Sequence, residues 1–352
     1  MENFNALTAE DVKKYAKSLG ADIVGISPMD RFEGAPKQHD ARYIFPGAKS
    51  MIVLGFRIPR GTLRGIEEGT YFAAYPSMGY AAMNQVMIPN ILHHLTCYLE
   101  DEGYETVPLM YMNGSATNTV TGKFRKGYSV NVDPEKPYPD VMINLRIAAY
   151  MAGLGEFGWS KVFLTPEFGP RVRFAALLTD AELEPDPIYE GKICDRCKQC
   201  VKHCAGKAIS MNESVKVTIA GHEVEWGKLD EMACEKGLQG GTDGSLDPFD
   251  GKYPHQFGYG RAVEGACGCI RACMVHLEER NRLTNKFKNK FRTEKTQWKI
   301  DRTKPYELTE DIIKNYVETG MVEDSDVYVK YNETDNYGTA KKKKEKPEGQ
   351  VD

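Results

Sequence analysis

The stretch Cys194-Asp-Arg-Cys197-Lys-Gln-Cys200-Val-Lys-His-Cys204 carries four cysteines at C-x₂-C-x₂-C-x₃-C spacing. Three thiolates spaced so closely can reach three corners of one iron–sulfur cubane, while the fourth points away and serves a second cluster. That geometry requires more cysteines downstream, and the chain has four, at positions 234, 267, 269 and 273. Because eight cysteines are the number that two such clusters need, we predict two [4Fe–4S] clusters.

The expected ligand sets follow from this spacing. One cluster is assigned Cys194, Cys197, Cys200 and Cys273. The other is assigned Cys204, Cys234, Cys267 and Cys269. Zinc is the main alternative, since four thiolates also make a closed tetrahedral site, but three evenly spaced cysteines followed by a fourth favour a cubane. A disulfide framework is disfavoured because the chain is long and crowds its cysteines two residues apart.

The other metal-binding residue types carry less information. The ninth cysteine, Cys97, lies on the apolar face of a predicted helix and is expected in the core. His203 lies within the cysteine run, where backbone contacts rather than ligation are expected. His276 follows the last cysteine and is a candidate to tune a cluster potential by hydrogen bonding to sulfur.

Length and composition indicate an ordinary globular protein. The 352 residues predict two domains, and a content of 41% hydrophobic and 27% charged residues is typical of soluble proteins. The sequence has no apolar run long enough to span a membrane and no basic region followed by an apolar run at its N-terminus, so we expect a cytoplasmic protein. A net charge of −4 does not favour nucleic-acid binding, except through a local basic patch.

The order of predicted elements indicates an α/β (α+β) fold. Thr8 and Asp11 form a capping pair at the start of a helix that Gly20 ends. Strands are predicted at 21–27, 50–58, 104–110 and 171–179, and further helices at 80–102, offset by Pro89, and 141–152. A hairpin is predicted from strands at 215–219 and 222–226.

Three regions follow from the composition along the chain. Residues 1–183 are expected to form an α/β domain, which ends at the linker Glu-Pro-Asp-Pro at 184–187. Residues 184–290 are expected to form a ferredoxin-like domain with both clusters. Residues 291–352 form a C-terminal extension whose lysine-rich run, 341–346, is interpreted as a solvated tail, with phosphate binding as the alternative.

Several stretches resemble one known superfamily, the corrinoid-dependent reductive dehalogenases and their relative epoxyqueuosine reductase. They are Ala152-Gly-Leu-Gly-Glu-Phe-Gly158, Leu164-Thr-Pro-Glu-Phe-Gly-Pro-Arg-Val-Arg-Phe174 and Leu178-Thr-Asp180, followed closely by the cysteine run. Gly20-Ala-Asp-Ile-Val-Gly-Ile26 and Phe45-Pro-Gly-Ala-Lys-Ser-Met-Ile52 are similar to the early segments of that superfamily. The resemblance covers roughly residues 10 to 280, in order.

The resemblance implies a fold and a cofactor. A nitroreductase-like α/β domain would hold a base-off cobalamin, and one cluster would lie beside the corrin to reduce its cobalt. An acid just upstream of the Gly-Leu-Gly helix would protonate the product, a role that falls to Asp140 or Tyr138 by position. The alternative for Asp140 is the N-cap of a helix that begins at Val141.

Four further candidate residues follow from the same resemblance. Arg171 and Arg173 lie where an anion or a polar substrate group could be bound, although alternating arginines on a strand are also typical of solvent-facing partners of acidic residues. Gly153 and Gly155 are candidate cofactor-binding positions.

The sequence departs from the family pattern at the cysteines. Ala205 and Met274 follow Cys204 and Cys273, where the family usually has proline, and Cys267-Gly-Cys269 is one residue shorter than the common C-x₂-C. These departures concern mainly the second cluster.

Three functions from different classes fit these observations. The first is a corrinoid reductase that acts on a small organic molecule, with electrons from a low-potential donor such as ferredoxin or flavodoxin. The second is a corrinoid-free iron–sulfur electron carrier or reductive activator of a partner protein. The third is epoxyqueuosine reductase acting on transfer RNA. Cobalt content separates the first from the second, and salt-sensitive tRNA binding would support the third.

Overall fold

A computed structural model describes residues 7–68, 74–109, 132, 141–204, 206–238, 268–292 and 310. The chain divides into two compact units, Met1–Arg292 and Thr293–Asp352. Only Glu310 of the second unit is described, so the architecture below is that of the first unit. It is a mixed α/β fold, as the sequence predicts, and none of its described helices is long and apolar enough to cross a membrane.

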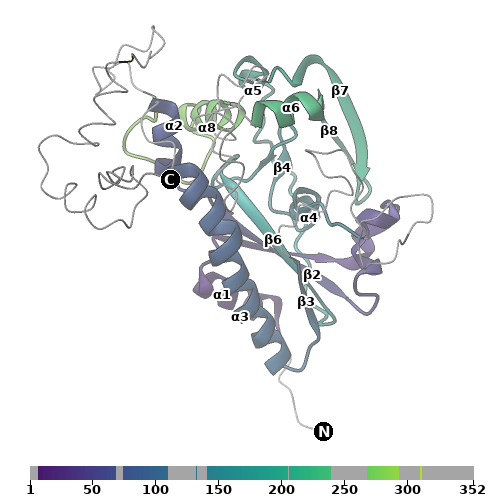
Figure 1. Ribbon diagram of the computed structural model, residues 1–352. Coiled ribbons are helices and arrows are strands. Elements are labelled where there is room, and N and C mark those ends of the chain that lie inside the picture. Colours follow the sequence, from purple (N-terminus) through teal and green to yellow (C-terminus); the bar gives the residue numbers. More distant parts are fainter. Residues whose placement is uncertain are drawn as a thin grey trace, which may run out of the picture. The chain divides into compact units, whose positions relative to one another are not determined.

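A four-stranded antiparallel sheet forms the centre of this unit (Figure 1). Its order is β1 (Ile23–Pro28), β2 (Ser50–Arg57), β6 (Val172–Thr179) and β3 (Thr106–Leu109). Seven of the eight residues of β2 are buried. A strand with such a continuous apolar run is covered on both faces, and this is what the structure shows.

Alternate side chains of β2 and β6 enter two separate apolar clusters. Ile52 and Leu54 pack on one face with α1 (Ala9–Leu19) and α3 (Ile88–Asp101). Met51 and Val53 pack on the other with α4 (Leu145–Met151). The period of two along each strand therefore decides which helix a residue contacts. Figure 1 shows α1 and α3 running side by side along the sheet.

The N-terminal elements agree closely with the prediction. Thr8 and Asp11 form the predicted capping box of α1, and Gly20 ends the helix in the left-handed conformation with φ 116°. The predicted strands at 21–27, 50–58, 104–110 and 171–179 correspond to β1, β2, β3 and β6.

Two predicted helices begin elsewhere than expected. The helix predicted at 80–102 starts at Tyr75 as a π-helix, η5 (Tyr75–Met87), and continues as α3 from Ile88. Pro89 lies in the first turn of α3, where its missing N–H is tolerated. The helix predicted at 141–152 begins only at Leu145, because the side chain of Asn144 caps it. Asp140 is therefore not the N-cap of this helix.

Three helices that carry cysteines follow the sheet in the chain. They are α5 (Gln199–Lys202), α6 (Glu231–Leu238) and α8 (Cys269–Glu279). The short strands β4 (Glu156–Phe157) and β5 (Phe163–Leu164) pair with each other and precede β6 in the chain. The predicted hairpin is confirmed as β7 (Ile209–Ile219) and β8 (His222–Leu229), which turn at Ala220 and Gly221, both with positive φ.

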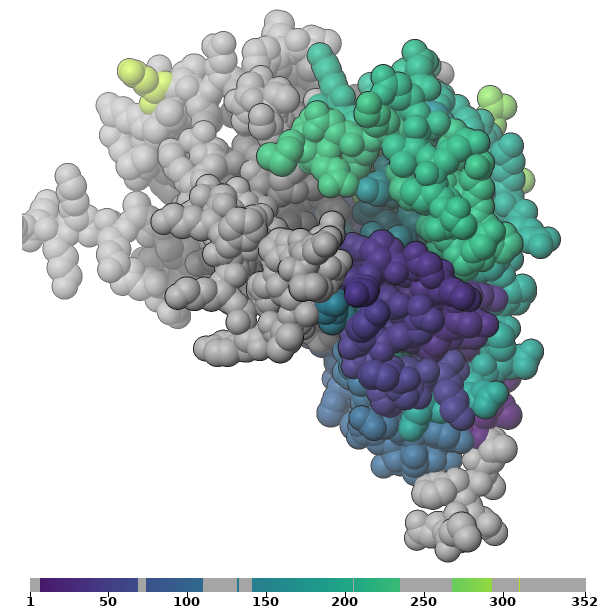
Figure 2. Space-filling model, turned by 90° about the vertical axis from the view of Figure 1, so that its right-hand side faces the viewer, coloured from purple at the N-terminus to yellow at the C-terminus, as the bar shows by residue number. Residues whose placement is uncertain are grey.

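The hairpin packs onto the N-terminal part of the chain. Figure 2 shows the hairpin (green) next to the segment after β1 (purple). That segment contains the 3₁₀-helices η1 (Met29–Phe32), η2 (Lys37–His39) and η3 (Ala41–Tyr43). Phe32 and Ala41 share an apolar cluster with Val224 and Trp226 of the hairpin. The boundary predicted at 183/184 remains a prediction, although the chain on both sides of it contributes to this shared core.

Candidate metal centre and cavity

Four of the predicted ligands lie near one another. The pKa of the Cys273 thiol on α8 is raised well above its ordinary value by burial and by the nearby thiols of Cys194, Cys200, Cys197 and, to the smallest extent, Cys269 of the second predicted set. Burial and the thiols of Cys194 and Cys197 likewise raise the pKa of Cys200 to about 11. The structure thus brings the three closely spaced thiols and the distant Cys273 to one place, as the first predicted ligand set requires. That these thiols hold a cluster remains a prediction.

The backbone of the cysteine run curves around this place. Arg196 and Lys198, on either side of Cys197, both adopt the left-handed conformation, with φ 59° and 62°. This conformation costs a non-glycine residue about 1–2 kcal/mol. Such a tight loop directs successive thiols to one side, which is how a short run can supply three ligands.

The surroundings of these thiols fit an iron–sulfur cluster. Backbone N–H groups of Gln199 and Val201 lie close enough to the thiols of Cys197 and Cys200 to oppose the rise of their pKa, although the N–H of Val201 donates to the backbone oxygen of Lys198. Cys194 and Cys273 also lie against an apolar cluster formed by Leu164, Ile193, Leu277 and Leu283. Thiolate donors, backbone N–H groups directed at sulfur and apolar walls are the features that hold such clusters and set their potentials.

Glu156 anchors the start of the cysteine run. Its Oε1 accepts hydrogen bonds from the backbone N–H groups of Ile193 (2.7 Å) and Cys194 (2.5 Å). Glu156 belongs to the Gly-Leu-Gly-Glu stretch that carries the family resemblance. No role for this glutamate follows from the sequence, because the two N–H groups that it binds lie 37 and 38 residues further along the chain. Its position shows that the stretch and the cysteine run form one structural unit.

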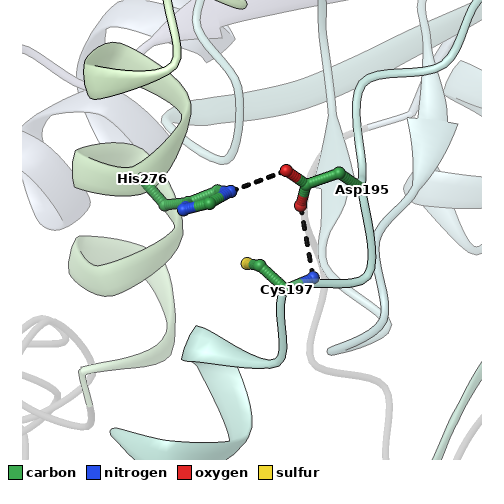
Figure 3. Close-up of side chains that lie close together, drawn as sticks. All are labelled: Asp195, Cys197 and His276. Atoms are coloured by element: carbon green, nitrogen blue, oxygen red, sulfur yellow. Dashed lines mark hydrogen bonds and ion pairs between the residues drawn. The ribbon is translucent and has the colours of Figure 1, made fainter.

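An Asp–His pair joins the cysteine run to α8 (Figure 3). One carboxylate oxygen of Asp195 lies 2.8 Å from Nε2 of His276, and the other accepts a hydrogen bond from the backbone N–H of Cys197 at 3.2 Å. Burial alone would raise the pKa of Asp195, but His276 and the N–H of Cys197 lower it. His276 therefore binds a carboxylate instead of the predicted sulfur.

Ligand atoms of Asp195, Cys197 and His276 lie within 4.8 Å of one another, a spacing that could also hold a single metal ion. The carboxylate is already engaged by its two partners, and Cys197 belongs to the four converging thiols. We interpret the group as a brace that keeps the cysteine run against α8.

The second predicted ligand set is described only in part. Cys204 and Cys269 contact the same apolar cluster, around Trp159 and Ile209, and Sγ of Cys204 accepts a hydrogen bond from Ala208 N–H at 3.3 Å. Cys234 lies in α6. Cys267 lies outside the described residues. No disulfide joins the eight cysteines that the structure describes.

Cys97 lies at the edge of the core instead of inside it. It is partly exposed on α3, and its sulfur lies 3.8 Å from Nε2 of His93.

A cavity of about 440 Å³ lies where η5, α4, β3 and β6 meet. Its described lining presents polar and apolar surface in nearly equal parts and includes residues 141–146, Ile44, Asn84, Pro108, Leu109 and 172–174. This volume and lining are typical of small-molecule sites. Tyr138 and Asp140, the predicted acids, lie outside the described residues, but Val141, which follows Asp140 in the chain, lines the cavity.

Arg171 is buried, with 1% of its surface exposed, so the expectation of a solvent-facing arginine is wrong. Its guanidinium donates to the backbone oxygen of Ile58 (2.6 Å) and to Oδ1 of Asn285 (3.1 Å). Burial lowers its pKa to about 10, which Glu278 opposes and Arg60 reinforces. Arg171 does not line the cavity in the described lining and instead ties the start of β6 to the segment after α8.

Arg173, the second candidate, does line the cavity. Its Nη2 donates to the hydroxyl of Tyr75 at 2.7 Å, and its guanidinium lies 4.5 Å from the ring centre of Tyr80. Both tyrosines belong to η5. The π-helix therefore fixes the position of Arg173 in this cavity, whereas Arg171 lines a separate one beside Asn285 and Phe287.

Gly153 and Gly155 allow close backbone contacts. A Cβ at Gly153 would lie 2.1 Å from the backbone oxygen of Pro187, and one at Gly155 would lie 2.0 Å from that of Leu164. Gly153 also has φ +72°. These contacts explain both glycines by the packing of the chain itself, and their predicted cofactor role remains a prediction.

Comparison with known proteins confirms the resemblance predicted from the sequence. No family model matches the chain. It is 27% identical over 233 residues to a tetrachloroethene reductive dehalogenase of Dehalobacter restrictus, an alignment that covers 58% of this chain and 39% of that protein. Over 65 residues it is 43% identical to the tetrachloroethene reductive dehalogenase of Sulfurospirillum multivorans, covering 18% of this chain and 13% of that protein.

A second group of relatives acts in a different reaction. An epoxyqueuosine reductase of Bacillus cereus is 21% identical over 252 residues, covering 64% of this chain and 54% of that protein. Among solved structures, a reductive dehalogenase matches with a TM-score of 0.48 and 22% identity, over 81% of this chain and 38% of that one. An epoxyqueuosine reductase matches with a TM-score of 0.41 and 19% identity, over 65% and 56%. The chain thus spans little more than a third of the dehalogenases' length.

Proposed function

We propose that this chain, a homologue of the reductive dehalogenases and of epoxyqueuosine reductase, is an iron–sulfur reductase. In this proposal single electrons pass through two [4Fe–4S] clusters to a corrinoid, and the corrinoid reduces a small organic substrate. The observation that carries the proposal is the convergence of three closely spaced thiols with Cys273 of α8. Four thiols at one place in an apolar setting have little use in a protein without a metal centre.

The residues around the first cluster would have different roles. Cys194, Cys197, Cys200 and Cys273 would ligate iron, and the backbone N–H groups at two of the sulfurs would stabilise the reduced, more negative state. Glu156 and the Asp195–His276 pair would hold the loop and α8 at a fixed separation. Cys204 and Cys269 would contribute to the second cluster together with Cys234 and Cys267. The apolar cluster that Cys204 and Cys269 contact also includes Cys194 and Cys200, so the two iron–sulfur clusters would share this wall.

The described cavity of about 440 Å³ has room for a small substrate but not for a whole corrinoid, so it would form only part of the corrinoid and substrate site. When bound, the corrinoid would supply a cobalt centre that two single-electron steps bring to its nucleophilic state. The protein's own residues would exclude water through the apolar part of the lining, orient the substrate at Arg173, and donate a proton from Asp140 or Tyr138.

An exposed basic segment supports docking of an electron donor. Residues 280–292, directly after α8, contain six basic residues and no acidic one, in a chain of net charge −4. Lys286, Lys288 and Lys290 are exposed, and Arg282 donates to the backbone oxygen of Ile193, next to Cys194. An acidic carrier such as a ferredoxin or flavodoxin would be attracted to this segment close to the first cluster. The rate of reduction by such a carrier should then fall steeply with added salt.

The same segment favours a second candidate function. Phosphates of transfer RNA would also bind a run of lysines, and one relative is named epoxyqueuosine reductase. Binding of a tRNA stem-loop that weakens with salt, together with reduction of its epoxyqueuosine, would replace the small-molecule proposal.

Metal content tests the proposal directly. The full chain would be produced anaerobically in cells supplied with cobalamin, and iron, cobalt and zinc would be measured per chain beside a visible spectrum. We expect about eight irons and one cobalt. Eight irons without cobalt would favour the corrinoid-free electron carrier or activator, and zinc in place of iron would refute the cluster assignment.

A further inference from the structure

A second cavity, of about 480 Å³, shares no described lining residue with the cavity at Arg173. Four guanidinium groups line it, those of Arg57, Arg60, Arg64 and Arg171. Asn285, Phe287 and Phe291 belong to the same lining, whose described residues include no acid. We call this space the arginine cavity.

One of the four charges has no carboxylate partner among the described residues. The other three each pair with one carboxylate outside the lining: Arg57 with Asp22 (2.8 Å), Arg60 with Glu278 (2.8 Å) and Arg64 with Glu68 (3.3 Å). Arg171 is the most deeply buried of the four, with 1% of its surface exposed. Within the described part of the chain, the arginine cavity therefore carries one surplus positive charge.

The surplus charge is unfavourable as long as the cavity is empty. Arg171 donates to two neutral groups, the backbone oxygen of Ile58 and Oδ1 of Asn285, and its Nε has no hydrogen-bond partner among the described residues. Burial lowers its pKa to about 10, so the guanidinium stays charged at neutral pH. A buried charge without a counter-ion destabilises a fold. A bound anion would supply the missing counter-charge.

The chemistry of the lining favours an oxyanion as that ligand. Guanidinium groups form paired N–H···O bonds with phosphate, which spherical anions cannot match. Two of the guanidiniums are held in place on aromatic rings: that of Arg60 lies 3.5 Å from the ring centre of Phe287, and that of Arg64 lies 4.0 Å from that of Phe291. Cations that are already positioned lose little freedom when a ligand binds. The ring of Phe287 is 40% exposed and offers apolar surface to the organic part of a phosphate ester.

We propose that the arginine cavity binds a phosphate group, either as inorganic phosphate or as part of a small phosphate ester. The bound phosphate would connect Asn285, in the segment after α8, to the end of β2 and the start of β6. This site is independent of the proposed function, because it includes no cysteine and no described residue of the cavity at Arg173.

The first test compares phosphate with chloride. The full chain would be unfolded by heat at neutral pH in either salt at the same ionic strength, and phosphate affinity would be measured by calorimetry. We expect phosphate to raise the unfolding temperature above that in chloride, because it binds the folded state. If phosphate has no more effect than chloride and gives no binding heat, the proposal is refuted.

Phenyl phosphate distinguishes the two sources of the phosphate group. Tighter binding of phenyl phosphate than of inorganic phosphate would support an ester as the ligand, with its ring near Phe287. Equal or weaker binding would support inorganic phosphate.

Arg57→Gln removes one of the charges that line the cavity. We expect it to weaken phosphate binding about tenfold or more. Arg42→Gln is the matched control, since Arg42 also pairs with an aspartate, Asp40, at 2.8 Å and is similarly exposed, but lies outside the described lining. Equal phosphate affinity of Arg57→Gln and Arg42→Gln would contradict the proposal.

Asn285→Asp tests the surplus charge itself. Nη2 of Arg171 lies 3.1 Å from Oδ1 of Asn285, so the new carboxylate would take the place of the anion. We expect this variant to unfold at a higher temperature than wild type in chloride and to gain nothing further from phosphate. Asn289→Asp adds the same charge at an exposed position of the same segment, outside the described lining, and should respond to phosphate like wild type. Wild-type phosphate affinity in Asn285→Asp would overturn the proposal.

Discussion

The candidate metal centre takes three of its four converging thiols from a run of seven residues, Cys194 to Cys200, and adds one from α8. The cavity takes its polar side chains from η5, α4 and β6, which are far apart in the chain. In the first region, chemistry is encoded by spacing within one loop. In the second, it arises only when the sheet and its helices have packed together.

This difference determines what a sequence can reveal. A repeated spacing of cysteines limits how their thiols can be placed around a metal cluster, even before any tertiary contact is known. The role of a single asparagine in an apolar helix cannot be predicted from spacing in this way. It depends on which residues surround the asparagine in the folded chain. The two regions nevertheless meet in one stretch, since Gly153 and Glu156 lie between α4 and the cysteine run.

The largest effect is expected from substitution of Cys273, the predicted ligand that lies far from the cysteine run in the sequence and near it only in the folded chain. Cys273→Ala should lower the iron content from about eight to about four per chain, because one cluster loses a ligand. Iron analysis and the visible spectrum measure this loss. Cys97→Ser is the control, since Cys97 lies on α3 and should leave both clusters intact. If Cys97→Ser lost iron, or if Cys273→Ala lost none, Cys273 of α8 would not be a cluster ligand.

A substitution between the two regions should have the next largest effect. Gly153→Ala places a Cβ 2.1 Å from the oxygen of Pro187 at a residue with φ +72°, which we expect to destabilise the fold by about 4 kcal/mol. Denaturant unfolding measures it. Gly221→Ala is the control, because its φ is also positive, +80°, but nothing lies within 4 Å of the added Cβ. Similar losses in both variants would mean that backbone conformation alone, and not the contact with Pro187, matters.

A smaller, pH-dependent effect is expected where α2 (Arg64–Glu68) meets α8. Glu67 pairs with Arg271 and Arg292. Burial alone would raise the pKa of Glu67, but the two arginines lower it below its ordinary value. The pair therefore stabilises the protein above about pH 4.5 and loses this contribution as the pH falls through the lowered pKa.

Glu67→Gln should accordingly cost about 2 kcal/mol near neutral pH and little at pH 3, where wild type has lost the same contribution. Unfolding curves at several pH values measure the difference. Glu223→Gln, which removes an exposed pair with Lys216 that solvent screens, should cost much less than Glu67→Gln near neutral pH. A constant deficit for Glu67→Gln across this range would exclude the charge as the cause.

Elements with a strong local signal were predictable. The capping box of α1, the four strands of the sheet and the turn at Ala220 and Gly221 each follow from a few neighbouring residues. The start of α4 was not, because Asn144 caps it more effectively than its predecessors and the apolar pattern continues upstream. The π-helical form of η5 was also missed, since the spacing of apolar residues in a short helix hardly differs between the two types.

For the candidate site, too, features with a local sequence signal were predictable and features that depend on tertiary packing were not. Proximity of Cys273 to the cysteine run agrees with the assignment from spacing. Burial of Arg171 could not be foreseen, because alternation on β6 ends where the segment at Asn285 covers it. The pairing of His276 with Asp195 depends on the angle at which α8 approaches the loop, which no spacing encodes. Asn84 gave no signal other than a polar residue in an apolar stretch.

The left-handed residues on either side of Cys197 have a consequence for what holds the cysteine run in shape. Arg196 pairs with Glu225 of β8 at 3.2 Å, and the charged ends of Arg196 and Lys198 lie over the ring of Trp159. Contacts of these two side chains therefore compensate for their unfavourable backbone. The curved form of the loop that carries Cys197 thus depends on the packing of the hairpin and of Trp159, two elements that contain no cysteine.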